Sequence, residues 1–253
     1  MDIIRSTRHG LVVAVSTLLA ATTVGSATVD AADRTATTPH DTFIRNTHTR
    51  NTPTCRGVPA THVDENGTSS NDVIVITQPL GFDAGDGDDL VCVAVPSMRE
   101  GARVDGGFGD DTIITLSGDN VIYGGPGNDS ILSNSADHIL DGEFGDDTMY
   151  LGQHPDGTVY GGDGADRIVG SPGADNVWAD AGNDLILGFG GDDTLRGGPG
   201  ADSISGHDGT DVLDGQDGDD ECVDVAAPAT TFVGCENITA FGVPMGPGTV
   251  TSG

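Results

Sequence analysis

The strongest constraint on the fold of this chain is a nine-residue phrase that repeats seven times without a gap over residues 161–223. The copies read GGDGADRIV, GSPGADNVW, ADAGNDLIL, GFGGDDTLR, GGPGADSIS, GHDGTDVLD and GQDGDDECV. The fourth place is always glycine and the sixth is always aspartate. The eighth place is apolar in every copy: Ile168, Val177, Ile186, Leu195, Ile204, Leu213 and Cys222. Disordered low-complexity chains do not keep such a phase, so the pattern indicates an ordered repeat structure.

The phrase continues upstream, but only at every second opportunity. Complete or near-complete copies begin at Ala84, Gly106, Gly124 and Gly142. The three segments that follow the copies at Gly106, Gly124 and Gly142 are degenerate copies. Their sixth places hold Asn120, His138 and Gly157 instead of aspartate. Residues 67–75 form the earliest and weakest copy, with aspartate at the sixth place and isoleucine at the eighth.

A turn followed by one short strand in each nine residues explains this alternation. Side chains alternate across a strand, so the eighth place points inward while the seventh and ninth point outward. Two nines then complete a coil, and turns 18 residues apart stack on the same edge. Copies beginning at 106, 124, 142, 161, 179, 197 and 215 share one edge, and those at 170, 188 and 206 share the other. We predict an all-β, parallel β-roll (a β-solenoid) with two repeats per coil, aspartate-rich along most of one edge and only in the C-terminal half of the other.

Stacked aspartates of this kind need a positive partner. Strands in a sheet lie about 4.8 Å apart, so sixth-place carboxylates on one edge form a column at about that spacing. Two charges at that distance repel by about 3.5 kcal/mol at an effective dielectric constant near 20. Glycine at the first, second and fourth places permits positive φ and close backbone approach, so turn carbonyls can point at a common centre. Oxygen ligands in flexible geometry favour Ca²⁺ over Mg²⁺.

Residues 84–223, with a weaker lead-in from residue 67, resemble the RTX (hemolysin-type) calcium-binding family. The resemblance implies a parallel β-roll that binds several Ca²⁺ ions between successive turns on the same side. The implied carboxylate ligands are Asp89, Asp111, Asp129, Asp147, Asp166, Asp175, Asp184, Asp193, Asp202, Asp211 and Asp220. The implied carbonyl ligands come from Gly107, Gly109, Gly125, Gly127, Gly162, Gly164, Gly173, Gly182, Gly191, Gly198, Gly200, Gly209 and Gly218. The departures at positions 120, 138 and 157 put calcium sites at those turns in doubt.

The charge balance is consistent with a cation partner. The chain has 40 acidic and 10 basic residues, a formal net charge of −30, and 35 of the acids are aspartate. We expect no nucleic-acid partner, because binding a polyanion needs a cationic surface. Solubility through charge is the alternative, but it does not explain why short carboxylates lie beside glycine in turns. Aspartates at the third and fifth places (Asp86, Asp110, Asp163 and Asp192) are expected to be solvated rather than ligating.

The start of the chain has the layout of a secretory signal peptide. Arg5 and Arg8 precede an apolar stretch that ends in small residues, with cleavage after Ala27 or as late as Ala31. A membrane anchor is the alternative, but the apolar core is short for a span, so we expect no transmembrane anchor in the mature chain.

The predicted organisation is a signal peptide (1–27), an irregular segment (28–66), a degenerate half-roll (67–160), the tandem repeats (161–223) and a C-terminal cap with a flexible tail (224–253).

Export agrees with the four cysteines, which allow three pairings and are expected to be oxidised outside the cell. We predict disulfides Cys55–Cys92 and Cys222–Cys235, one at each end of the repeats; buried, reduced cysteines are the alternative.

The favoured function is a secreted, non-enzymatic calcium-binding protein that folds when it binds Ca²⁺. One alternative is a cell-surface adhesin or matrix scaffold that calcium stiffens, with a partner that the sequence does not identify. A roll-type enzyme is a further alternative, but the chain has no H-E-x-x-H or G-x-S-x-G motif and no lysine for a phosphate-binding loop.

Overall fold

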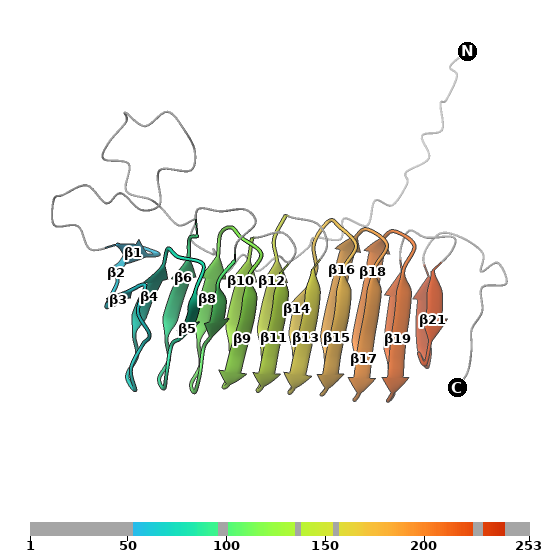
Figure 1. Ribbon diagram of the computed structural model, residues 1–253. Helices are drawn as coiled ribbons and strands as arrows, with labels where there is room; N and C mark the ends of the chain where they lie inside the picture. The colour runs from blue at the N-terminus through green and yellow to red at the C-terminus, as the bar shows by residue number, and fades with distance from the viewer. Residues whose placement is uncertain (1–52, 96–100, 135–137, 154–156, 225–229, 241–253) are drawn as a thin grey trace, which may run out of the picture.

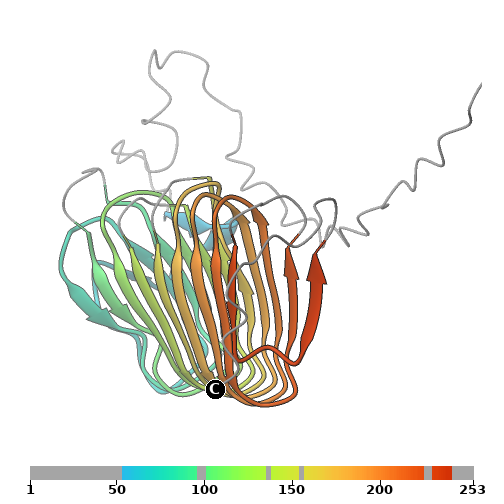
Figure 2. The same cartoon turned by 90° about the vertical axis from the view of Figure 1, so that its right-hand side faces the viewer.

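The computed structural model describes residues 53–95, 101–134, 138–153, 157–224 and 230–240. Every regular element in these ranges is a β-strand. The ranges contain no helix long and apolar enough to span a membrane. The strands wind into a flattened β-solenoid made of two sheets that face each other (Figures 1 and 2). The predicted signal peptide, residues 28–52 and the predicted tail beyond residue 240 lie outside the described ranges.

From β4 onward, successive strands alternate between the two sheets, and within each of these sheets all neighbours are parallel. The eleven-stranded sheet contains β3 (His62–Val63), β4 (Val73–Ile76), β6 (Leu90–Val93), β8 (Thr112–Thr115), β10 (Ser130–Ser133), β12 (Thr148–Leu151), β14 (Arg167–Val169), β16 (Leu185–Gly190), β18 (Ser203–Asp208), β20 (Glu221–Asp224) and β22 (Asn237–Ala240). The nine-stranded sheet contains β5 (Gly81–Asp83), β7 (Arg103–Asp105), β9 (Val121–Pro126), β11 (Ile139–Phe144), β13 (Thr158–Asp163), β15 (Asn176–Ala181), β17 (Thr194–Pro199), β19 (Val212–Asp217) and β21 (Thr231–Val233). A short antiparallel hairpin, β1 (Thr54–Cys55) and β2 (Val58–Pro59), lies at the N-terminal end.

The strand register confirms two repeats per coil. Ile186 pairs with Ile204, and Ile204 pairs with Cys222, each 18 residues further along the chain. The one extra residue in the segment before residue 161 lengthens that coil to 19 residues, so that Met149 pairs with Ile168. The parallel β-roll predicted from the repeats is therefore the fold of the chain.

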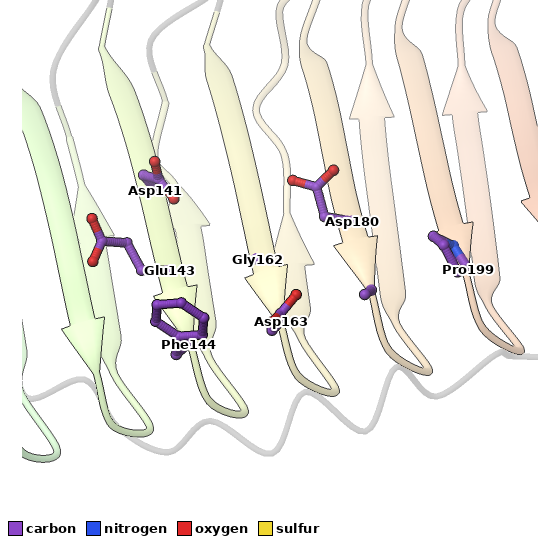
Figure 3. Close-up of a pocket in the computed structure, with 8 residues that line it drawn as sticks. Asp141, Glu143, Phe144, Gly162, Asp163, Asp180 and Pro199 are labelled. Carbon is purple, nitrogen blue, oxygen red and sulfur yellow. The ribbon is translucent and has the colours of Figure 1, made fainter.

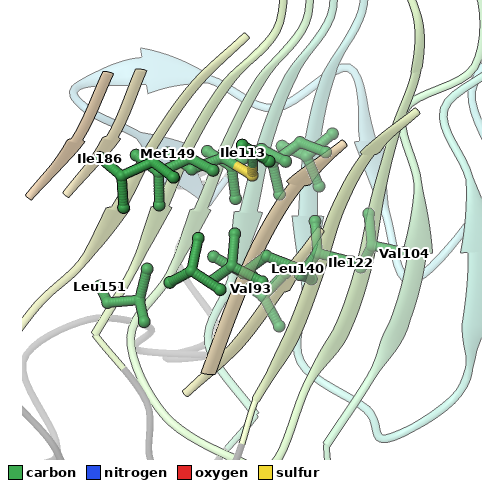
Figure 4. Close-up of a cluster of buried hydrophobic side chains, with 14 of the residues drawn as sticks. Val93, Val104, Ile113, Ile122, Leu140, Met149, Leu151 and Ile186 are labelled. Atoms are coloured by element: carbon green, nitrogen blue, oxygen red, sulfur yellow. The ribbon is translucent and has the colours of Figure 1, made fainter. Parts of the chain in front are cut away.

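The eighth-place side chains form the core. They alternate with half-exposed neighbours, and nearly all are fully buried. Figure 4 shows two rows of them, with Ile113, Met149 and Ile186 from the eleven-stranded sheet opposite Val104, Ile122 and Leu140 from the nine-stranded sheet. Each buried side chain of this size contributes about 1.5–3 kcal/mol relative to exposure, so the repetition of one place stabilises the whole roll.

Both predicted disulfides are present, and each ties an end of the roll. The Cys55–Cys92 bond links the β1–β2 hairpin to the outer face of β6, where a second apolar cluster includes Val75 and Ile114. The Cys222–Cys235 bond lies in the last coil and explains why a cysteine occupies an inward place.

The flanking segments contribute more strands than the sequence suggested. Residues 54–63, expected to be irregular, hold β1, β2 and β3, and β3 pairs with β4. In the segment expected to form a cap, β21 pairs with β19 and β22 pairs with β20, so the cap continues both sheets.

Candidate metal centre

The turns at the two edges of the roll bury their sixth-place side chains in two columns. We call the edge where the chain passes from the nine-stranded to the eleven-stranded sheet the first edge, and the opposite one the second edge (Figure 1). The first-edge column contains Asp72, Asp89, Asp111, Asp129, Asp147, Asp166, Asp184, Asp202 and Asp220. The second-edge column contains Asn120, His138, Gly157, Asp175, Asp193 and Asp211. All the aspartates in both columns are buried.

In every column aspartate except Asp72, one carboxylate oxygen holds two turns together. Asp129 Oδ1 accepts the backbone N–H of Asp111 at 2.8 Å, and Asp147 Oδ1 accepts that of Asp129 at 2.7 Å. The same bond recurs along both columns from one coil to the next. At the C-terminal end of the first column, Glu236 accepts the N–H of Asp220 at 2.9 Å. The sixth-place aspartate is therefore an inter-turn hydrogen-bond acceptor, a role that needs no metal.

The second oxygen is different, because in ten turns it is buried and has no hydrogen-bond partner. These Oδ2 atoms belong to Asp89, Asp111, Asp129, Asp147, Asp166, Asp184, Asp193, Asp202, Asp211 and Asp220. An unbonded buried polar group costs about 1–3 kcal/mol, and more when it is charged. Ten of them in two columns are too many for chance defects of packing, so each requires a partner.

The atoms around these oxygens are backbone carbonyls and glycine. A Cβ placed on Gly106 would lie 2.5 Å from Asp111 Oδ2 and 2.3 Å from the carbonyl oxygen of Gly124. First-place glycine thus leaves room for the carboxylate and a neighbouring carbonyl to converge. These first-place glycines are not among the residues with positive φ, so the prediction of left-handed backbone there is wrong; their role is close approach.

Many second- and fourth-place residues do use left-handed backbone, as predicted, but the fourth-place glycines Gly173, Gly182, Gly200 and Gly218 are not among those with positive φ. Gly107 and Gly109 have φ of 94° and 127°. The fourth-place carbonyl of each turn faces the fourth-place glycine of the next coil; a Cβ on Gly127, for example, would lie 1.9 Å from the oxygen of Gly109. Carbonyls that the sequence assigned as ligands therefore point from one turn toward the next on the same edge.

The Asn120 turn shows what a hydrogen-bond donor does at this place. Asn120 Oδ1 accepts the N–H of Ala102, as an aspartate would. Its Nδ2 donates to the carbonyls of Ser117 and Gly118 at 2.9 and 3.1 Å. Carbonyls of the turn therefore lie within reach of the second side-chain atom, where an aspartate has an oxygen and would need a cation between.

A family model supports the same conclusion. Residues 103–137, 160–188 and 187–222 match the model of the RTX calcium-binding nonapeptide repeat. These segments are RTX calcium-binding nonapeptide repeats. No curated protein and no solved structure matches the chain.

Calcium fits the donor set of the RTX turns. Within the described ranges no point gathers three or more histidine, cysteine, aspartate or glutamate side chains. A bound ion would therefore take a carboxylate oxygen from the column and complete its shell with backbone carbonyls. All-oxygen ligation of this kind, with mixed carboxylates and carbonyls, is what Ca²⁺ uses in proteins.

Burial raises the pKa of these carboxyls, and the charges of neighbouring carboxylates add to the effect in most turns, while the N–H bond to Oδ1 opposes it. The pKa is about 6 for Asp89, Asp166 and Asp202, about 7 for Asp111, Asp129, Asp184 and Asp193, and about 8 for Asp147. Burial likewise raises the pKa of Asp175, Asp211 and Asp220. Without a cation, the folded column competes for protons near neutral pH, which is the behaviour of carboxylates arranged to bind a positive charge.

Sequence reasoning missed a second row of side chains. Asp110 and Asp192 are exposed, as predicted, but each Oδ1 also accepts the N–H of the fifth-place residue in the next coil, Asn128 and Thr210 respectively. Asp146 and Asn183 do the same. The recurrence of aspartate or asparagine at the fifth place was a sequence signal for this row.

The outer face of the nine-stranded sheet holds an acidic pocket that the sequence also did not reveal. It is lined by Asp141, Glu143, Phe144, Gly162, Asp163, Asp180, Ala181 and Pro199 (Figure 3). Burial and mutual repulsion raise the pKa of Asp141, Glu143 and Asp180. No sixth-place aspartate lines the pocket, but Glu143, Gly162 and Asp180 are the second-place residues of the turns that hold Asp147, Asp166 and Asp184.

Proposed function

We propose that this protein is a secreted, non-enzymatic calcium-binding roll that folds when Ca²⁺ enters the columns of sixth-place aspartates. The observation that carries the proposal is the set of ten buried Oδ2 atoms without a partner, each in a glycine-rich turn. In the unfolded chain the same carboxylates are solvated and far apart. The sites therefore exist only in the folded state, and the binding free energy contributes directly to folding.

The ligands in this proposal are the ten Oδ2 atoms and the second- and fourth-place turn carbonyls. Eight of the ten belong to the first edge, from Asp89 to Asp220, and two, Asp193 and Asp211, belong to the second. Asp175 differs from the others, because both of its oxygens are hydrogen-bonded within the protein. The first edge is accordingly the main calcium-binding edge along the whole roll.

Secretion supplies the conditions that such a protein needs. The N-terminal sequence has the layout of a signal peptide, and the two disulfides are typical of an oxidising compartment. Extracellular calcium sites commonly have dissociation constants of about 10⁻⁴ to 10⁻³ M. A roll tuned to that range stays loose in the cytoplasm and folds after export.

Circular dichroism of the disulfide-bonded mature chain tests this function. At pH 8 we expect a largely disordered far-UV spectrum in EDTA and a β-sheet spectrum after Ca²⁺ is restored, with Mg²⁺ much less effective. A variant with asparagine at all ten positions should no longer respond to Ca²⁺. Identical spectra of the wild type with and without Ca²⁺ would contradict the proposal.

A further inference from the structure

Two sixth-place aspartates have no unbonded oxygen. Asp175 Oδ2 accepts the N–H of Ser171 at 2.7 Å, and its Oδ1 accepts the N–H of Gly157 and the Ser171 hydroxyl. Asp72 is bonded in the same way, because its Oδ2 accepts the N–H and the hydroxyl of Thr68 at 2.8 and 2.9 Å. Ser171 and Thr68 occupy the same position, the second place of their turns. In these two turns, hydrogen bonds from the protein itself satisfy both oxygens of the carboxylate.

The backbone of the second place separates these two turns from the other ten. In every turn with an unbonded Oδ2, the second residue is left-handed, with φ between 67° and 121°. These second-place residues are Gly85, Gly107, Gly125, Glu143, Gly162, Asp180, Phe189, Gly198, His207 and Gln216. Ser171 and Thr68 do not have positive φ. We call the ten left-handed turns open and the two others closed.

Glycine content does not explain the difference. Five open turns place Glu143, Asp180, Phe189, His207 or Gln216 in the left-handed region, although this costs a non-glycine residue about 1–2 kcal/mol. A serine or threonine offers an alternative, since its hydroxyl can bond a nearby carboxylate or backbone group. Ser171 Oγ donates to Asp175 Oδ1 at 3.2 Å and accepts the N–H of Gly173 at 3.1 Å. The hydroxyl thereby stabilises the conformation in which the Ser171 N–H points at Oδ2.

We propose that the second-place residue decides whether a turn takes a cation, and that Ser171 keeps the Asp175 turn closed to calcium. This inference rests on the proposed calcium-binding function and specifies which aspartates take part in it. The same rule makes the Asp72 turn, closed by Thr68, independent of calcium.

The closed turns lie where each aspartate column begins. Asp72 is the first aspartate of the first column, and Asp175 follows Gly157 as the first aspartate of the second. Each column of open turns therefore stacks on a turn that is already complete without metal. Calcium sites can be added to this base one coil at a time.

Calorimetric titration of the full mature chain with Ca²⁺ tests the rule. Ser171→Gly removes the hydroxyl and permits positive φ, so it should open the turn and bind one more Ca²⁺ per chain than the wild type. Ser171→Thr should keep the wild-type number, as Thr68 does at its own turn. His207→Gly is the matched control, because its turn is already open on the same edge, and it should also leave the number unchanged.

A second pair of variants tests the rule in the opposite direction. Asp175→Asn should retain the wild-type number of ions, whereas Asp193→Asn, one coil further, should lose one. A wild type that binds no Ca²⁺ would contradict the proposed function itself. If the wild type binds Ca²⁺ but Ser171→Gly gains no ion, or Asp175→Asn loses one, the proposed role of Ser171 is wrong.

Discussion

The two edges of the roll are made from the same nine-residue repeat, yet they differ in which residue occupies the sixth place and in how its side chain is hydrogen-bonded. On the first edge, eight open turns follow one another without interruption from Asp89 to Asp220. On the second edge, Asn120, His138 and Gly157 precede the closed turn of Asp175. Of the sixth-place aspartates on this edge, Asp193 and Asp211 have an unbonded oxygen.

The difference shows which part of the motif builds the fold and which part binds metal. The parallel sheets and the apolar rows continue through both edges, so an aspartate at the sixth place is not required for the coil. An amide is enough at Asn120, where Nδ2 bonds the turn carbonyls directly. The unbonded carboxylate is thus a feature added to a turn that can form without it.

The largest expected effect is the pH dependence of the metal-free protein. The pKa of Asp111, Asp129 and Asp147 is raised to about 7 or 8 in the folded state, against about 3.9 in an unfolded chain. The folded state therefore binds more protons, and its stability is complete below about pH 4 and is lost as pH rises to about 8. In calcium-free buffer the melting temperature should fall by more than about 10 °C over the lower part of this window, since 1 kcal/mol shifts it by about 2–8 °C, and the folded state should be lost near pH 8.

Calcium should abolish that dependence. An ion that binds the ionised carboxylate replaces the proton, so affinity rises with pH and the melting temperature in saturating Ca²⁺ should not decline. Melting followed by circular dichroism, with and without Ca²⁺, gives both curves. A metal-free protein that becomes more stable between pH 4 and pH 8 would show that the columns are not held by protonation.

The next effect separates the two edges by multiple substitution. Asparagine at Asp129, Asp147 and Asp166 removes three unbonded oxygens from the middle of the first column. Asparagine at Asp193 and Asp211 removes both from the second. We expect three and two fewer Ca²⁺ ions respectively by calorimetry. Calcium-dependent protection in hydrogen exchange should be lost around the middle coils in the first variant and only in the C-terminal half in the second.

Equal effects of the two variants on the N-terminal coils would contradict this asymmetry. Among the described residues, the second edge has no buried unbonded aspartate oxygen before Asp193, so we expect no response there to the double substitution.

The sequence predicted the fold well because the information is periodic. The eighth place and the 18-residue coil follow from spacing, and the structure contains both. Spacing left three disulfide pairings open, and the structure contains the predicted one, with a bond at each end of the repeats. The state of individual turns did not follow, because it depends on one N–H group. Ser171 resembles a neutral substitution for glycine in the sequence, and only its φ and its 2.7 Å bond to Asp175 show that the turn is closed. The repeat pattern also gives no sign of the contact between His62 and Asp72 at the start of the first column, where Nε2 lies 3.3 Å from Oδ1.

A smaller effect comes from a pair of single substitutions at Asp147. Asp147→Ala removes the acceptor of the buried Asp129 N–H, which should cost about 1–3 kcal/mol. Asp147→Asn keeps that acceptor and can donate to the turn carbonyls as Asn120 does. In calcium-free buffer near pH 6, Asp147→Asn should therefore have the highest melting temperature, the wild type an intermediate one and Asp147→Ala the lowest.

Both variants should bind one Ca²⁺ fewer than the wild type. The advantage of Asp147→Asn over the wild type should disappear below about pH 4, because a protonated carboxyl already resembles the amide. An asparagine variant that is less stable than the alanine variant would mean that the carbonyls around Asp147 do not converge as those around Asn120 do.

The smallest expected effect lies on the outer face of the nine-stranded sheet, between the edges. Trp178 in β15 stacks on Tyr160 in β13, with ring centroids 5.2 Å apart. Arg196 lies on the next strand of the sheet, β17, and its guanidinium carbon is 5.0 Å from the centre of the Trp178 ring. Trp178→Ala should cost about 1–2 kcal/mol, the sum of a stacked aromatic pair and an exposed cation–π contact. Urea unfolding in saturating Ca²⁺ measures this cost, with Trp178→Phe as the control that keeps an aromatic ring and should lose less stability.

Neither variant should change the number of bound Ca²⁺ ions, because the ring points away from both columns. A lost ion would show that the outer row helps to set the turns, and the difference between the edges would then depend on the sheet face as well as on the second place.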